Sequence, residues 1–379
     1  MIFRPLRGQN ARPYHTPTGL VTKPGLIERM GMVSWEPAMM ATAIGSLPYT
    51  DPEEACAVTL RHLTEVPAWP QLPRRDFREN MYAQYSEGLP GVVVDKERRK
   101  VYCDTSRDLL PEVEEVYRAY LDGDYASMTI SPEYAAGLHA FAARVEEEGK
   151  VYPILKGQVT GPISFGLTVL DENDRPILYN DQLADAMVRV LNMKARWMES
   201  FLRGTGAAED VLIFFDEPYL VSVGSALVSV GPERVVDSIR QCMEGLSCLT
   251  GAHCCGNTDW TLLFKAGVRV VNFDAYQYME SMALYPAEVT AFLEAGGVLA
   301  WGLVPNNAAV DGETVESLAR RFEEGVDLLA SRGVDRGLLA RRAMITPTCG
   351  LEGLTAERAE RAYTLTNKLS GLLRGRAQG

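Results

Sequence analysis

Short apolar runs alternate with helix-like stretches along most of the chain. Each run is bounded by glycine, proline or polar residues, and several runs are apolar without interruption. Uninterrupted apolar runs of this length are typical of strands that are buried on both faces of a parallel sheet. We predict eight strands, at residues 39–45, 65–72, 151–159, 211–216, 246–254, 268–274, 297–304 and 343–349.

The intervals between these runs carry helical patterns. Residues 181–203 give the clearest one, in which six apolar residues follow one stripe of a helix: Leu183, Met187, Val190, Leu191, Met198 and Leu202. Another helix is expected to begin at "DPEE", because Asp51 can cap it, Pro52 suits its first turn, and Glu54 completes a capping-box-like pair.

Strands that alternate with helices predict an α/β fold with a parallel sheet. Eight of them favour a single (β/α)8 TIM barrel over residues 38–379, and a doubly wound open sheet is the alternative. The interval at about 73–150 is then an insertion after the second strand, with a hairpin where "GVVVD" and "KVYCD" flank "KERR". Residues 1–37 are rich in proline and glycine, and we predict an extended N-terminal arm there.

Composition narrows the class of protein. The net charge of −12 argues against nucleic acid as the main partner. The seven cysteines are spread irregularly, unlike a secreted disulfide framework. The N-terminal residues do not resemble a signal peptide, and no apolar run approaches the ~20 residues of a membrane span. We therefore expect a cytoplasmic protein with free thiols and no membrane partner.

Several predicted strands end in polar residues whose side chains can bind a metal or take part in catalysis. In a (β/α)8 barrel the carboxyl ends of the strands form one rim, and catalytic groups lie on it. An active site is therefore expected on that rim, built from the polar strand ends: Ser46, Lys156 to Pro162, Asp216, His253, Asp274 and Cys349.

The stretch "AHCCG" holds the most specific of these groups. Side chains alternate along a strand, so His253 and Cys255 face one way, while Cys254 faces the other and packs as a small apolar residue. With Cys349 they make one imidazole and two thiols, a set suited to zinc, and Asp274 is a candidate fourth ligand. A Cys–His nucleophile pair and plain core residues remain alternatives, although the spacing is poor for proton transfer.

The ordered set "ATAIGSLPYTDPEEA", "KGQVTGP", "FFDEPYL", "HCCGNT", "VNFD" and "TPTCGL" resembles the catalytic barrel of cobalamin-independent methionine synthase. It is also similar to the corrinoid-dependent thiol methyltransferases of the uroporphyrinogen decarboxylase superfamily. The resemblance runs from about residue 40 to the C-terminus. It implies a barrel whose zinc activates a thiol, with ligands at His253, Cys255 and Cys349. The family's glutamate ligand falls on Asp274, which is a departure from the pattern.

The same resemblance implies residues for the acceptor, homocysteine, which becomes methionine. The serine of "IGS" falls on Ser46, and the aspartate of "DEP", which binds the amino group, falls on Asp216. A further acid for that amino group lies near "RRDFREN", where Asp76 is the nearest candidate.

The methyl donor is expected to be a methylcorrinoid, either methylcobalamin or a corrinoid protein. Folate-dependent relatives use a second barrel, and this chain fits one barrel with an arm. "RRDFREN" and "KERRK" are read as a solvated face or, alternatively, as a docking surface for a corrinoid protein. Two other functions stay open: methylation of another thiol such as coenzyme M, and a metal-free uroporphyrinogen decarboxylase-like activity. Against the latter, Ser46 and "LPYT" stand where an arginine-rich motif is expected.

Overall fold

A curled sheet of seven parallel strands forms the centre of the part that the structure describes. This computed structural model describes residues 35–225 and 228–378, so nearly all of the predicted arm lies outside the described residues. The strand order is β1-β10-β9-β8-β7-β6-β4, and every pair is parallel. The strands span Met40–Ala41 (β1), Tyr152–Thr160 (β4), Ala208–Asp216 (β6), Leu249–Cys254 (β7), Val270–Asp274 (β8), Val298–Val304 (β9) and Ala343–Pro347 (β10). Seven of the eight predicted strands and the α/β class are thus confirmed.

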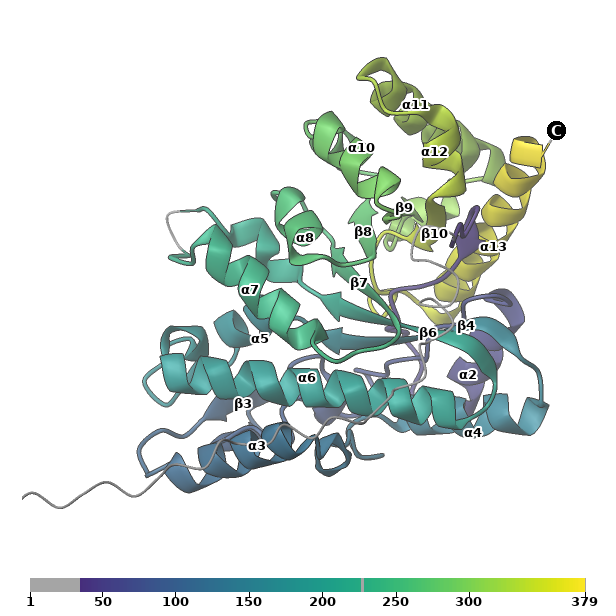
Figure 1. The fold of residues 1–379 in the computed structure, drawn as a ribbon. Helices are drawn as coiled ribbons and strands as arrows, with labels where there is room; N and C mark the ends of the chain where they lie inside the picture. The colour runs from purple at the N-terminus through teal and green to yellow at the C-terminus, as the bar shows by residue number, and fades with distance from the viewer. Residues whose placement is uncertain (1–34, 226–227, 379) are drawn as a thin grey trace, which may run out of the picture.

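Helices cover the outer face of this sheet (Figure 1). Their bounds in the described residues are Pro52–His62 (α2), Leu110–Asp122 (α3), Ala136–Glu148 (α4), Pro162–Thr168 (α5), Asp181–Gly204 (α6), Pro232–Met243 (α7), Thr261–Ala266 (α8), Met279–Met282 (α9), Pro286–Glu294 (α10), Val315–Ser331 (α11), Arg336–Arg341 (α12) and Ala356–Gln378 (α13). Helix α6 agrees with its predicted range, and its apolar stripe is buried. Asp51 caps α2 by accepting hydrogen bonds from the backbone N–H groups of Glu53 and Glu54.

The two faces of the sheet are both apolar, which is why the strands lack polar alternation. The concave face encloses a cluster of buried apolar side chains, against which Met40 of β1 also packs: Val66, Ile154, Leu212, Phe214, Leu249, Val270, Val298, Ala300 and Met344. The convex face packs on the helices in a much larger cluster. The strands also carry a few buried polar groups, such as Lys156 in β4 and Asn272 in β8, and these are hydrogen-bonded to neighbouring segments.

The predicted second strand, residues 65–72, differs from the other seven. It makes single bridges, Ala68 to Lys156 of β4 and Gln71 to Ser46 after β1, and forms no regular strand. Pro67 and Pro70 have no backbone N–H, so an uninterrupted ladder cannot form here. The described sheet is accordingly a curled half-barrel of seven strands, with residues 65–72 between its two edges.

The insertion at 73–150 contains the predicted hairpin. Strands β2 (Val92–Asp95) and β3 (Lys100–Cys103) pair antiparallel, and β5 (Leu170–Asp171) joins β3 in a small second sheet. Helix α4 of this region packs against α2, and α3 packs against α6. At the other end of the chain, α13 packs against β10, β1 and α2, so the first and last described segments lie side by side (Figure 1). None of the described helices is long and apolar enough to cross a membrane.

Candidate metal centre and active site

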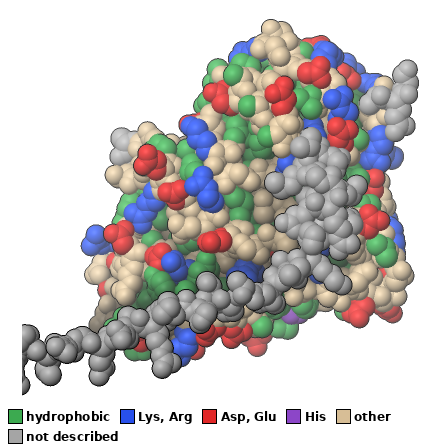
Figure 2. All heavy atoms as spheres, in the orientation of Figure 1, with side chains coloured by type: hydrophobic (Ala, Val, Ile, Leu, Met, Phe, Trp, Pro, Cys, Tyr) green, Lys and Arg blue, Asp and Glu red, His purple; other side chains and the backbone are tan. Residues whose placement is uncertain are grey.

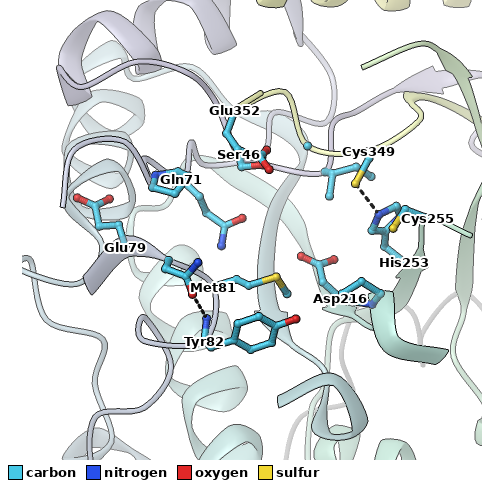
Figure 3. A pocket seen from close by; sticks show the side chains of 15 residues that line it. Ser46, Gln71, Glu79, Met81, Tyr82, Asp216, His253, Cys255, Cys349 and Glu352 are labelled. Atoms are coloured by element: carbon cyan, nitrogen blue, oxygen red, sulfur yellow. Dashed lines mark hydrogen bonds between the residues drawn. The ribbon is translucent and has the colours of Figure 1, made fainter. Parts of the chain in front are cut away.

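Three of the predicted ligands lie together at the carboxyl end of the sheet. His253 is in β7, Cys255 follows the end of β7, and Cys349 follows β10. Their ligand atoms all lie within 4.8 Å of one another, and His253 Nε2 is 3.4 Å from Cys349 Sγ (Figure 3). A tetrahedral zinc ion bound at about 2.0–2.3 Å would hold its ligand atoms roughly 3.3–3.8 Å apart. The donor set and its spacing therefore fit zinc.

Asn272 in β8 orients the histidine. Its side-chain N–H₂ donates to the carbonyl oxygen of Ala300 and to Thr346 Oγ1, both at 2.8 Å, so its amide oxygen is left as an acceptor. That oxygen lies 2.5 Å from His253 Nδ1, which must therefore carry the proton. Nε2 is then free to face the two sulfurs, as a metal-binding imidazole requires. Asn272 is opposite His253 in the sheet register.

The two thiols differ in their proton affinity. A hydrogen bond from Cys349, with a second one from His253, lowers the pKa of Cys255. The hydrogen bond to Cys255 together with burial raises the pKa of Cys349. Burial lowers the pKa of His253, but its hydrogen bond with Cys255 and nearby negative charges outweigh this and raise the pKa overall. Cys255 is therefore the thiol of this group that ionises more readily, and the thiolate is the form in which cysteine binds metals.

Asp274 lies near this group but not within it. Its carboxylate accepts hydrogen bonds from the backbone N–H and the side-chain amide of Gln277, at 2.9 and 2.8 Å. Burial raises the pKa of Asp274 to about 6, although the bonds from Gln277 oppose the shift. The predicted fourth ligand is therefore held by Gln277 in this structure.

Ser46 and Asp216 line the same cavity as the three ligands. The cavity has a volume of about 340 Å³, and Asp216 projects into it from the end of β6 (Figure 3). Asp216 is 7% exposed, and its Oδ1 has no hydrogen-bond partner among the described residues. Burial raises the pKa of this carboxyl group, opposed by the charges of Lys156 and His253. An unpartnered buried acid is a ready site for a cationic group of a ligand.

Asp76 is not among the residues that line the cavity. It caps a short 3-10 helix, Phe77–Glu79, and pairs with Arg78 and with Lys96 at 2.8 Å. Glu79 lines the cavity instead, on the side away from His253 (Figure 3). Burial raises the pKa of Glu79 to about 7, and its ion pair with Arg75, at 2.5 Å, opposes the shift.

Several further polar residues in and around the site were not predicted from the sequence as functional, among them Asn272, Glu79, Glu217 and Glu352. The carboxylate of Glu217, which follows Asp216, accepts hydrogen bonds from the N–H groups of Ile163 and Ser164 and so caps α5 beside the cavity. The sequence does contain a pattern that points to two of these residues, Glu217 and Asn272. "DEP" places Glu217 next to a predicted site residue, and "VNFD" places Asn272 on the same strand face as Asp274.

The basic segments 74–80 and 96–100 do not present a free positive surface. Most of their cations pair with acids: Arg75 with Glu79, Arg78 and Lys96 with Asp76, Arg98 with Asp95, and Lys100 with Asp174. Acidic and basic side chains are also interspersed over the face seen in Figure 2. This pairing is what a solvated face would show, and the docking surface for a corrinoid protein stays a prediction.

Comparison with solved structures finds the same fold elsewhere. The chain is similar to a B12-independent methionine synthase from Shewanella sp. W3-18-1 in complex with selenomethionine, at 14% identity and a TM-score of 0.55, over 89% of this chain and 98% of that one. It is also similar to a methyltransferase from Methanosarcina mazei, at 14% identity and a TM-score of 0.51, over 92% of each chain. A scan against protein-family models and a search of curated protein sequences found no match.

Proposed function

We propose that this chain is a zinc-dependent methyltransferase that transfers a methyl group to the thiol of homocysteine and so forms methionine. The observation that carries the proposal is the group His253, Cys255 and Cys349 in one cavity with Asp216, whose Oδ1 has no hydrogen-bond partner within residues 35–225 and 228–378. The likeness in fold to a methionine synthase and a methyltransferase supports it.

His253, Cys255 and Cys349 would hold the zinc ion, with solvent or a displaced Asp274 in the fourth position. Bound zinc would keep the acceptor thiol deprotonated at neutral pH, where a free thiol of pKa near ~8.5 is mostly protonated. The thiolates of Cys255 and Cys349 would balance the charge of the metal and so leave the acceptor sulfur electron-rich. Asn272 keeps His253 in the tautomer that this site needs.

Asp216 binds the ammonium group of the acceptor, and the Ser46 hydroxyl, which donates to Glu352 in the ligand-free cavity, lies where it can donate to the carboxylate instead. Both groups lie at one cavity with the sulfur ligands, so they can hold the acceptor with its thiol toward His253 and Cys255. In the transfer, the acceptor sulfur forms a bond to the methyl carbon as the donor–methyl bond breaks, and the donor keeps that electron pair. The thiol proton passes to solvent before the attack.

We further propose a methylcorrinoid, methylcobalamin or a corrinoid protein, as the donor. Three acids line the cavity, Asp216, Glu79 and Glu352, and no lysine or arginine of the described residues lines it. The polyglutamate tail of a folate would therefore find no cation in the cavity lining and would meet the exposed charge of Glu352. A corrinoid needs only to bring its methyl group above the acceptor sulfur.

We infer that residues 65–72 act as the eighth strand of a (β/α)8 barrel. Backbone N–H groups of Ile154 and Lys156 donate to Glu65 and Pro67, at 3.2 and 2.9 Å. On the other side, Gln71 donates to the carbonyl oxygen of Gly45 at 3.1 Å. These bonds span both edges of the seven-stranded sheet.

The proposal is tested by methionine formation from homocysteine, with methylcobalamin and methyltetrahydrofolate assayed in parallel on zinc-loaded enzyme without oxygen. We expect methionine from methylcobalamin and none above background from methyltetrahydrofolate. The variant Cys349→Ser should lose the activity together with its zinc. Turnover with the folate and none with the corrinoid would contradict the donor assignment, and turnover with neither would contradict the methyltransferase.

A further inference from the structure

Ser46 is already engaged in the ligand-free cavity. Its hydroxyl donates a hydrogen bond to the carboxylate of Glu352, and the two side chains lie together at one end of the cavity (Figure 3). The backbone fixes this arrangement, since Leu351 N–H donates to the carbonyl oxygen of Ser46 at 2.8 Å. The pair also lies next to Gly350, where a Cβ atom would collide with Ser46 Oγ and come 2.6 Å from Glu352 Oε2.

Glu352 differs from the other two acids of the cavity. Glu79 is neutralised by Arg75, and Asp216 is buried close to the charge of Lys156. Glu352 is exposed, and no lysine or arginine in the described part of the chain forms an ion pair with it. It therefore adds a negative charge beside the Ser46 hydroxyl without a compensating cation.

This placement matters for an amino-acid acceptor. Asp216 takes the ammonium group under the proposed function, so the carboxylate of the acceptor needs a donor elsewhere in the cavity. Ser46 has one O–H group, and that group can donate to one acceptor at a time. The carboxylate of homocysteine must therefore displace Glu352 from Ser46 and then remain close to a like charge, which disfavours its binding.

We propose that Glu352 is a specificity-determining residue, which competes with the carboxylate of the acceptor for the Ser46 hydroxyl. Glu352 then lowers the affinity of the site for homocysteine relative to the same aminothiol without a carboxylate, and so sets how strongly the acceptor is held. This inference rests on the proposed function, because it takes the cavity to be the acceptor site.

The test compares homocysteine with 3-aminopropane-1-thiol, which has the same thiol and ammonium groups but no carboxylate. Binding of each to the zinc-loaded protein is measured by calorimetry for the wild type and for Glu352→Gln. The glutamine can donate a hydrogen bond to the carboxylate and carries no charge. The ratio of the two dissociation constants should shift toward homocysteine by roughly tenfold, the size of one charge-assisted contact.

Glu357→Gln is the matched control, since it removes an exposed charge of α13 five residues away and should leave the ratio unchanged. Zinc content, measured for each protein, shows that the site stays intact. A ratio that is unchanged in Glu352→Gln, or that shifts away from homocysteine, would overturn the inference while leaving the methyltransferase in place. Failure of both thiols to bind any of the zinc-loaded proteins would instead overturn the proposed function, and the inference with it.

Discussion

Two adjacent cysteines at the end of β7 have opposite surroundings. Cys254 is fully buried among apolar side chains of the convex core, and burial raises the pKa of its thiol to about 12. Cys255 lines the cavity, and its hydrogen bonds with Cys349 and His253 lower the pKa of its thiol. The alternation of side chains along β7 causes this difference, since successive residues face opposite sides of the sheet.

We therefore expect alanine variants of Cys254 and Cys255 to differ in the amount of zinc that they bind. Cys255→Ala should lose most of the bound zinc, because it removes one of three ligands, whereas Cys254→Ala should keep it. Zinc per protein chain, measured by mass spectrometry after desalting, gives the answer. Loss of zinc from Cys254→Ala with retention in Cys255→Ala would reverse the assignment.

Asp216 is expected to determine acceptor affinity without affecting the metal. Asp216→Asn keeps the shape of the side chain but removes the charge that pairs with the ammonium group. A charge-assisted hydrogen bond contributes ~1.5–3 kcal/mol, so the dissociation constant for homocysteine should rise at least roughly tenfold. Zinc content should not change. Asp237→Asn, at an exposed position on α7, serves as the control, and equal affinities in the two variants would exclude this role.

At the level of elements, the strands of the sheet can be predicted from the sequence because each is marked by a short apolar run of its own. Apolar runs mark seven strands, and alternation within β7 correctly separates Cys254 from its neighbours. The segment 65–72 has the same apolar character, but Pro67 and Pro70 remove the backbone donors that a regular strand needs. Composition alone does not distinguish a strand from an extended segment held by single bridges.

Strand β4 places a buried lysine under the cavity. Lys156 Nζ donates to the carbonyl oxygen of Ile44 at 2.8 Å and to Gln158 Oε1 at 3.2 Å, and it lies 4.4 Å from the ring centre of Phe214. Burial lowers the pKa of Lys156 to about 8, opposed by the charge of Asp216. The ammonium group of Lys156 therefore fixes the backbone at Ile44, two residues before Ser46, although burial of the charge is unfavourable.

This burial predicts a pH dependence of stability. The pKa of Lys156 is lower in the folded chain than in the unfolded chain, so the unfolded chain binds more protons between about pH 8 and 10.5. The contribution of Lys156 to the free energy of unfolding should accordingly rise with pH in this window, by roughly 2 kcal/mol from pH 7.5 to 9.5. Urea unfolding of the wild type and of Lys156→Met at both pH values isolates this contribution. The other titrating groups cancel when the free energy of unfolding of the variant is subtracted from that of the wild type. A difference that stays constant or falls with pH would show that Lys156 is not buried as a cation.

On the scale of the whole molecule, the site joins segments that are far apart in the sequence. Ser46 follows β1, Asp216 ends β6, His253 is in β7, and Cys349 follows β10. The parallel sheet brings these strand ends to one rim, which the sequence predicts from topology alone. The same reasoning does not extend to the insertion, which contains Asp76 and Glu79 and follows no regular strand. Only the three-dimensional structure shows that Glu79 lines the cavity and that Asp76 does not.

The central claim is that His253, Cys255 and Cys349 hold a zinc ion that is open to the acceptor thiol. X-ray absorption at the zinc edge tests it most directly, because it counts the sulfur neighbours of the metal. We expect two sulfurs at about 2.3 Å in the protein alone and three after homocysteine is added. A sulfur count that does not rise on addition of homocysteine, or a protein that takes up no zinc, would contradict the claim.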